Sequence, residues 1–451
     1  MPALWRDPRQ CAREYAAAIA EFSARDAATK PEAFARELAP HLAACPSPAQ
    51  ATASAAAFFN SLKPPKFLRP RLLIDVSHIA NNDHGTGIPR VVREIIRATY
   101  LRDRSDFEAV AFQRVNDEVY PASSWLEQQG LGLPFEAAGA APKAIEFRAG
   151  DRLLMLDSSW AEYGDFAAIF QDARAAHVPI TTVIYDLLPI NLPSTDIVAG
   201  GKAWFEQWIR SAIEESDNLL CISRTVADEL ITYIRMHKLE RTGLQVGYWH
   251  LGSIIPTAMG RLAAATALDV ARPYALMVGT IEPRKNHLLA LQAFEFLWEK
   301  GLNLSLVIAG RKGWLVDDLM ERLRSHRAIG KTLFLFEEIN DDKLSDIYRQ
   351  AEVVLFLSKG EGFGLPLVES ANYGTPIICS DIPIFHEIAE DHATFVKIDD
   401  PIMLAADIEK WQILSAAKEV PFSAGMKRLT WKQSTESMID VVIGNNWYWK
   451  A

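Results

Sequence analysis

The chemistry that the sequence suggests begins with the stretch SKGEGFGLPLVES, residues 358–370. Two glutamates, Glu361 and Glu369, lie on either side of a glycine-rich segment that runs into Pro366 and a helical pattern. A helix N-terminus attracts anions through its free N–H groups and its dipole. Carboxylates beside such a site suit a ligand with phosphates and sugar hydroxyls, because amides bind phosphate oxygens and carboxylates accept hydrogen bonds from diols. A nucleotide-sugar has this alternation, whereas the alternative interpretation is a capped helix with solvated acids.

A second stretch, VGTIEPRKNH at residues 278–287, places two cations at the end of a predicted strand. Gly279 follows the strand, and Arg284 and Lys285 come just before a helical pattern. Adjacent cations in this position suit a diphosphate, because their charge adds to that of the helix N-terminus. Alone, such a pair is usually solvated surface. The coincidence of the two stretches is what favours a nucleotide-sugar site.

The elements that must position these residues alternate between strand and helix patterns. From residue 71 the apolar, strand-like runs are RLLIDVS, DRLLMLD, PITTVIYDLLP and NLLCIS. After an alanine-rich connector that ends near residue 271, the pattern restarts with YALMVGT, LSLVIAG, VVLFLS and PIICSD. Strands that alternate with helices predict doubly wound parallel sheets. Two of them in tandem predict an α/β protein with a ligand cleft between the carboxyl ends of the two sheets.

Length and composition limit the class of protein. A chain of 451 residues suits two or three domains, and its formal net charge of -10 argues against a general nucleic-acid binder. The four cysteines, Cys11, Cys45, Cys221 and Cys379, are scattered, and we expect them to be reduced. No apolar run reaches the roughly 18 residues of a membrane span, and the first residues lack the apolar core of a signal peptide. We therefore expect a cytoplasmic protein, and contact with the membrane surface stays open.

The first part of the chain differs from the rest. Residues 1–62 are rich in alanine and helical in pattern, and the proline-containing stretch KPPKFLRP reads as a linker. We interpret residues 1–62 as an appended helical extension. Its expected role is packing or homo-oligomer contact, with docking to a partner or a membrane as the alternative.

Together, these stretches resemble the GT-B glycosyltransferases of family 4. GTIEPRKN, the seven-residue spacing of Glu361 and Glu369, and the stretches TPIICSDIPIFHEI and FSAGMKRLTWKQSTESMIDVV stand in the order of that family. The resemblance is strong over residues 271–445 and absent over 1–62. It is looser over 71–255, where TGIPRVVREI and YDLLPI are similar to the acceptor domain of bacterial polysaccharide mannosyltransferases.

The resemblance implies two doubly wound, Rossmann-like domains that face a cleft. The acceptor-side domain would cover residues 71–270 and the nucleotide-sugar-binding domain residues 271–425. Residues 426–451 would form a closing helix that packs back on the first domain.

The resemblance also implies a set of donor contacts at Gly279, Thr280, Arg284, Lys285, Ile339, Glu361, Gly362, Phe363, Gly364, Leu365 and Glu369. Arg284 and Lys285 would hold the diphosphate, and Glu369 the ribose hydroxyls. Glu361 and the amides of residues 362–365 would meet the transferred sugar and the distal phosphate, and Ile339 stands where the family's backbone contacts the base.

In the first domain, Thr86 and Gly87 stand where a glycine loop of the family approaches the donor phosphates. Arg90 would steer the phosphates or an acceptor, or serve as a surface arginine at a helix start. Asp186 would orient an acceptor hydroxyl or cap its own loop. The expected catalytic residues are Glu361, Arg284, Lys285 and Asp186.

Two departures from the family pattern leave contacts open. Many members have arginine where this chain has Thr280, and histidine where this chain has Tyr185. They put the phosphate and acceptor contacts in doubt.

The expected function is that of a retaining glycosyltransferase without a metal or other cofactor. In an SNi-like route, the leaving diphosphate accepts the proton of the acceptor on the attacked face, while the protein stabilises charge and positions both substrates. By resemblance, the donor is GDP-mannose and the acceptor a saccharide or lipid-linked saccharide of surface polysaccharide or lipopolysaccharide synthesis. UDP-, dTDP- and GDP-deoxy sugars remain alternatives.

Three rival classes fit the sequence less well. A retaining glycoside hydrolase with two close carboxylates would leave the Arg-Lys pair without a purpose. A nucleotide-dependent oxidoreductase would need a G-x-G-x-x-G fingerprint after its first strand, and GTGIPR has Arg90 at the last glycine position. A non-catalytic nucleotide-sugar-binding scaffold would not need the full set of phosphate and sugar contacts.

Overall fold

The computed structural model describes residues 69–83, 87–102, 106–131, 143–158, 160–253, 270 and 273–451. The helical extension expected at residues 1–62, the loop residue Thr86 and most of the alanine-rich connector lie outside the described residues.

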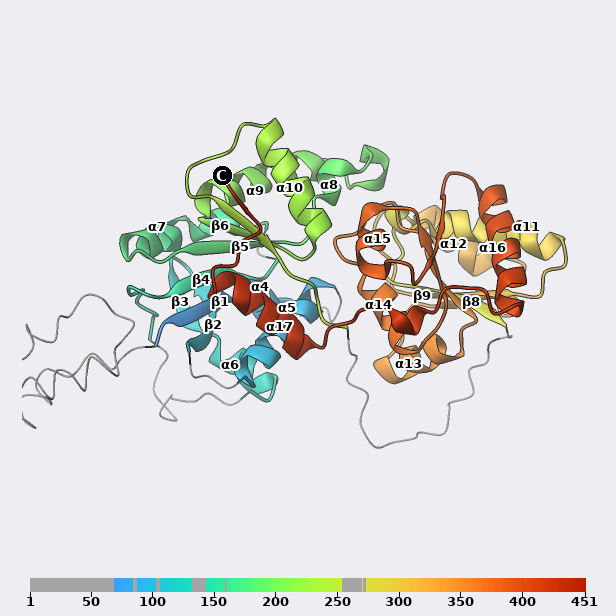
Figure 1. Ribbon diagram of the computed structural model, residues 1–451, viewed down its shortest axis with the longest axis horizontal. Helices are drawn as coiled ribbons and strands as arrows, with labels where there is room; N and C mark the ends of the chain where they lie inside the picture. The colour runs from blue at the N-terminus through green and yellow to red at the C-terminus, as the bar shows by residue number, and fades with distance from the viewer. Residues whose placement is uncertain are drawn as a thin grey trace, which may run out of the picture. The chain divides into compact units, whose positions relative to one another are not determined.

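The first domain is built on a sheet of eight described strands in the order β14-β7-β6-β5-β4-β1-β2-β3 (Figure 1). From β1 through β4, β5 and β6 to β7, neighbours pair in parallel, whereas β14 and β3 are antiparallel to β7 and β2. The strands are β1 (Arg71–Asp75), β2 (Glu108–Val115), β3 (Glu118–Pro121), β4 (Arg152–Met155), β5 (Ile180–Ile184), β6 (Asn218–Cys221), β7 (Gln245–Tyr248) and β14 (Trp449–Lys450). Every residue of β5 and β6 is buried, which is why these strands read as continuous apolar runs.

Helices lie between the strands of the first domain. They are α4 (Ser77–Asn81), α5 (Ile88–Tyr100), α6 (Ser123–Gln128), η1 (Tyr163–Phe166), α7 (Ala167–Ala175), α8 (Leu188–Asn191), η2 (Ser194–Asp196), α9 (Gly201–Glu215) and α10 (Arg224–Met236). Helix α5 buries Val91, Val92, Ile95 and Ile96 on one face, as its helical period predicts. Helix α10 begins at a serine cap, because the side chain of Ser223 accepts a hydrogen bond from the N–H of Val226.

The second domain is built on a sheet of six described strands in the order β10-β9-β8-β11-β12-β13, and all neighbouring pairs are parallel. The strands are β8 (Tyr274–Val278), β9 (Ser305–Ala309), β10 (Leu333–Phe336), β11 (Val353–Phe356), β12 (Ile377–Ser380) and β13 (Thr394–Val396). In the domain's own numbering this order is 3-2-1-4-5-6, that of dinucleotide-binding folds. The order reverses between β8 and β11.

Helices cover both faces of the second sheet, as in other doubly wound sheets (Figure 1). They are η3 (Pro283–Lys285), α11 (His287–Glu299), α12 (Asp317–Ser325), α13 (Asp341–Gln350), α14 (Leu365–Asn372), α15 (Pro383–Ala389), α16 (Pro401–Ala416) and η4 (Ser423–Gly425). The expectation of two doubly wound α/β units in tandem is therefore confirmed.

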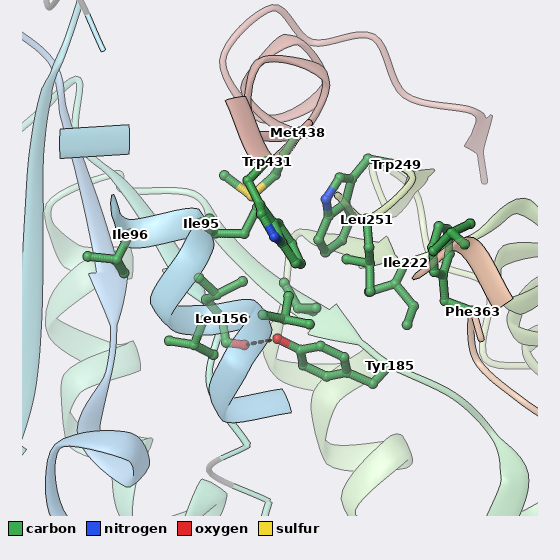
Figure 2. Packing of buried hydrophobic residues seen from close by; sticks show 14 of the residues in the cluster. Ile95, Ile96, Leu156, Tyr185, Ile222, Trp249, Leu251, Phe363, Trp431 and Met438 are labelled. Carbon is green, nitrogen blue, oxygen red and sulfur yellow. Dashed lines mark hydrogen bonds between the residues drawn. The ribbon is translucent and has the colours of Figure 1, made fainter. Parts of the chain in front are cut away.

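The chain ends by returning to the first domain. Helix α17 (Trp431–Val442) packs against α5, and Figure 2 shows Trp431 and Met438 beside Ile95. The hydroxyl of Ser434 donates a hydrogen bond to the carbonyl of His250 at 2.7 Å. After α17, strand β14 adds an antiparallel edge to β7. The C-terminal residues thus complete the first domain.

Two further observations bear on the sequence-based expectations. Cys221 and Cys379 are buried in β6 and β12 without a disulfide, as expected of reduced core thiols. Among the helices that the structure describes, none combines the length and the apolar character that a bilayer crossing requires.

Side chains of the two domains share one apolar cluster. Phe363, from the second domain, lies beside Ile222 and Leu251 of the first (Figure 2). The hydroxyl of Ser223 donates a hydrogen bond to the carbonyl of Gly362 at 2.8 Å.

Glu387 on α15 contacts the first turn of α10. Its carboxylate accepts hydrogen bonds from the N–H groups of Arg224 and Thr225, both at 2.7 Å, and from the Thr225 hydroxyl at 2.5 Å. His250 Nε2 lies 2.7 Å from the same carboxylate. Burial alone would raise the pKa of Glu387, but these hydrogen bonds lower it to about 2. The charged carboxylate therefore stabilises the contact between α15 and α10.

We expect the Glu387→Gln variant to be less stable than the wild type above pH 4.5, where the lowered pKa contributes fully. A shift from 4.5 to about 2 corresponds to at most about 3 kcal/mol. This contribution is lost as the pH falls from 4.5 towards 2, because the folded protein then binds the proton that the unfolded chain already holds. Urea denaturation from pH 2 to 7 should show the difference in the free energy of unfolding shrinking towards low pH.

The exposed residue Glu352 offers a matched control, because Glu352→Gln removes the same charge away from the contact between α15 and α10. Its stability should follow that of the wild type at every pH. A difference for Glu387→Gln that stays constant over this range would contradict the proposed role of the carboxylate.

Candidate active site

The two stretches singled out in the sequence meet at the strand-order reversal of the second sheet. Strands β8 and β11 are hydrogen-bonded neighbours, although β9 and β10 separate them in the sequence. Ligands of doubly wound sheets bind in the crevice at the carboxyl ends of strands where the order reverses. Arg284 and Lys285 follow β8, and Glu361 follows β11. Both stretches therefore reach this crevice.

Glu361 is held between the two cations. Lys285 Nζ lies 2.6 Å from Glu361 Oε1, and Arg284 Nη1 lies 2.9 Å from Oε2. The hydroxyl of Ser358 donates a further hydrogen bond to Oε1 at 2.7 Å. Burial would raise the pKa of Glu361, but Arg284 and Lys285 lower it to about 2. We call Arg284, Lys285, Ser358 and Glu361 the Glu361 network.

Two more carboxyl groups lie near Arg284. Arg284 Nε lies 2.6 Å from Glu282 Oε1, and its Nη1 donates a hydrogen bond to the carbonyl of Gly360 at 2.9 Å. Burial raises the pKa of Glu282 and of Asp186, and the charge of Arg284 offsets this only in part. These two groups therefore accept a proton more readily than exposed acids do.

Glycines allow the loop after β11 to lie close to the first domain. A Cβ at Gly362 would collide with the carbonyl oxygen of Tyr185. Gly364 has φ +88°, a left-handed conformation that glycine adopts without steric cost, and helix α14 begins at the next residue, Leu365. Pro366 lies in the first turn, where its missing N–H costs no helical hydrogen bond.

Glu369 binds an arginine from the first domain. Its side chain is only 3% exposed, and Arg90 Nη1 lies 2.5 Å from its Oε1. The hydroxyl of Tyr348 on α13 donates a hydrogen bond to Oε2 at 3.2 Å. The family resemblance predicts Glu369 as a partner of the ribose hydroxyls and leaves Arg90 open between the phosphates, an acceptor and a surface role. In the structure the two side chains bind each other.

The segment around Asp186 lies at the carboxyl end of β5. Figure 2 shows that Tyr185 lies in the apolar core, and its hydroxyl donates a hydrogen bond to the carbonyl of Leu156 at 2.7 Å. Asp186 Oδ1 accepts a hydrogen bond from the N–H of Leu188 at 3.0 Å, so Asp186 stabilises the turn that leads into α8. Its charge also interacts with Arg284 and Glu361.

The remaining predicted residues lie at the edges of this arrangement. Gly279 has φ +129°, and a Cβ added to it would lie 3.6 Å from Lys285 Nζ. Thr280 is the next residue in the chain. Ile339 lies between β10 and α13, partly buried against the apolar cluster, and no contact joins it to the Glu361 network among the described residues.

Gly87 caps the start of α5. Phe363 points its ring into the apolar cluster, so only its backbone can serve the crevice.

Sequence reasoning missed several side chains that shape the crevice. Ser358 stands in the first stretch, three residues before Glu361, and Glu282 stands two residues before Arg284, so proximity in sequence was a usable signal. Tyr348 comes from α13, and only the fold brings it to Glu369. Over the described residues, no group of three or more His, Cys, Asp or Glu side chains is placed to hold a metal ion.

Comparison with protein families and relatives agrees with this geometry. Residues 261–419 match the family described as Glycosyl transferases group 1. The chain is 35% identical over 378 residues to the serotype-specific mannosyltransferase WbdA of Escherichia coli, an alignment that covers 82% of this chain and 46% of WbdA. It is 29% identical over 174 residues to the O-antigen chain mannosyltransferase B of Escherichia coli, which covers 37% of this chain and 45% of that protein. The chain thus spans less than half the length of both relatives.

Among solved structures, the Anabaena protein Alr3699/HepE in complex with UDP has a similar fold. Its TM-score is 0.51 at 12% sequence identity, over 83% of this chain and 95% of that chain. At this identity the likeness concerns the fold alone. Residues 261–419 are therefore similar in sequence to the glycosyl transferases group 1 family, and the chain has the two-domain GT-B fold.

Proposed function

We propose that this chain is a retaining glycosyltransferase that moves mannose from GDP-mannose to a saccharide acceptor of surface polysaccharide or lipopolysaccharide synthesis. The observation that carries the proposal is the Glu361 network, which gathers two cations and a carboxylate at the strand-order reversal of a dinucleotide-binding sheet.

The charges of the crevice suit a diphosphate. Arg284 and Lys285 lie beside the start of α11 and are paired with Glu361, and their remaining N–H groups can donate hydrogen bonds to phosphate oxygens. Glu282 and Asp186, whose pKa values burial raises, can take up a proton when an anion arrives. The crevice can therefore reduce its own negative charge as the donor binds.

In the proposed mechanism, the bond between the sugar C1 and the diphosphate oxygen breaks while the acceptor oxygen bonds to C1 on the same face. The acceptor hydroxyl gives its proton to the leaving diphosphate. Arg284 and Lys285 stabilise the charge that develops on that diphosphate, and Glu361 fixes the positions of both cations. The protein contributes orientation and charge stabilisation and no nucleophile.

The relatives guide the choice of sugar and acceptor. WbdA is named as a serotype-specific mannosyltransferase, and the second relative as an O-antigen chain mannosyltransferase. We therefore propose mannose as the transferred sugar and a saccharide or lipid-linked saccharide as the acceptor. A lipid-linked acceptor would bring the chain to the inner face of the membrane.

Replacing Lys285 tests the proposed diphosphate site. We expect Lys285→Ala to lower the transfer of radiolabelled mannose from GDP-mannose by at least 100-fold, about 2.7 kcal/mol of transition-state stabilisation. The double variant Lys285→Ala/Glu361→Gln also removes the carboxylate charge that has lost its lysine partner, and it should be inactive too. The control variant Lys331→Ala removes an exposed lysine and should keep full activity.

Far-UV circular dichroism should be unchanged in all three variants. Transfer by the Lys285→Ala variant within threefold of the wild-type rate would remove the proposed role of this lysine.

The choice of base is tested by thermal shift with GDP, UDP and dTDP at equal concentrations. We expect GDP to raise the melting temperature most, because at equal concentration the ligand with the lowest Kd stabilises the folded state most. A larger shift with UDP would overturn GDP-mannose as the donor and leave the glycosyltransferase proposal standing.

A further inference from the structure

A cavity of about 720 Å³ lies between helices α8, α10 and α15. Helices α8 and α10 follow β5 and β6 in the first domain, and α15 follows β12 in the second. The cavity is therefore lined by helices of both domains. Its volume falls within the range of roughly 300–1,000 Å³ that is typical of small-molecule sites. We call it the α10 cavity.

Glu229 on α10 is an unusual member of the cavity wall. Burial and the nearby Asp186 carboxyl raise the pKa of Glu229 to about 7. Among the described residues, Glu229 receives a hydrogen bond from the Asn191 amide at 3.0 Å instead of an ion pair. A carboxyl group without a cation costs free energy to bury. Groups of this kind in a cleft are candidates for ligand binding.

The cavity wall suits a neutral ligand with many hydroxyl groups. Carboxyl groups line it at Asp228, Glu229 and Glu387, of which Glu387 already binds the start of α10, beside the guanidinium of Arg224 and the imidazoles of His237 and His386. This excess of carboxyl groups disfavours phosphates and other anions. Sugar hydroxyls can donate to carboxylates and accept from amides, and the cavity offers both kinds of partner.

The α10 cavity also connects to the Glu361 network. Asp186 interacts electrostatically with Arg284 and Glu361 on one side and with Glu229 on the other. Asp186 accepts a hydrogen bond from the first residue of α8, Leu188, and the last residue of this helix is Asn191, the partner of Glu229. A Cβ at Gly360 in the loop after β11 would lie 2.6 Å from Leu188, so that loop packs against α8. The short helix α8 thus lies between the donor crevice and the α10 cavity.

We propose that the α10 cavity binds the saccharide acceptor, with Glu229 and Asn191 holding hydroxyl groups of the sugars that adjoin the reacting one. This inference rests on the proposed function, since it names the site of the second substrate. Glu229 serves as a specificity-determining residue, and Asp186 lies between the acceptor in the cavity and the donor in the crevice.

Two variants of the full-length chain test the cavity. Glu229→Ala removes the carboxyl that accepts hydrogen bonds, and Asn191→Leu removes the amide at an exposed position where folding is not at risk. The control Glu214→Ala removes an exposed glutamate of α9 outside the cavity. Binding of α-mannobiose and α-mannotriose is measured by saturation-transfer NMR titration. GDP binding is followed by thermal shift, and consumption of GDP-mannose is measured separately.

We expect both cavity variants to bind the saccharides at least tenfold more weakly than the wild type. GDP binding should be unchanged in them, and Glu214→Ala should match the wild type. Equal saccharide binding by the wild type and both cavity variants would overturn the inference, and so would no binding to the wild type at millimolar concentration. If the wild type does not consume GDP-mannose, the proposed function is refuted. The two outcomes are distinguishable because the saccharide titration does not depend on turnover.

Discussion

The buried carboxylate of Glu361 between Arg284 and Lys285 is the interaction on which the rest of the crevice depends. It joins the loop after β8 to the loop after β11, two neighbouring strands at the strand-order reversal. A carboxylate that is 9% exposed stays charged only because the two cations and the Ser358 hydroxyl compensate its lost hydration. The same pairing holds the cations in place, which a site for a diphosphate requires. The glutamate is therefore a positioning group for cations.

The contacts between the domains involve the same loops. The loop after β11 contacts the first domain at Gly362 and Phe363, and Glu369 on the following helix binds Arg90. Glu387 adds a contact at the start of α10. A ligand that binds Glu369 must compete with Arg90. In our account, donor binding is therefore coupled to the contact between the two domains.

Much of the fold could be predicted from the sequence, because buried parallel strands are continuous apolar runs and helices show their own period. The runs NLLCIS and VVLFLS, for example, became β6 and β11. The two chemical stretches could also be placed after strands, at the carboxyl edge of one sheet, as the structure has them. The positions of strands and helices can therefore be predicted from the local pattern of apolar residues.

Contacts between distant segments could not be predicted in this way. Nothing in the sequence near Arg90 indicates that it binds Glu369, 279 residues away, or that Tyr348 lies beside the same carboxyl. The pairing of Glu361 with Arg284 and Lys285 needed the neighbour relation of β8 and β11, which sequence order hides. No pattern in the sequence marks Glu229 as a candidate site residue, because its raised pKa arises from burial and from the nearby Asp186.

A crystal structure of the chain with GDP-mannose tests the central claim most directly. Our account predicts diphosphate oxygens within hydrogen-bond distance of Arg284 and Lys285, with ribose hydroxyls at Glu369 in place of Arg90. Density for the donor elsewhere, with the crevice between β8 and β11 empty, would contradict it.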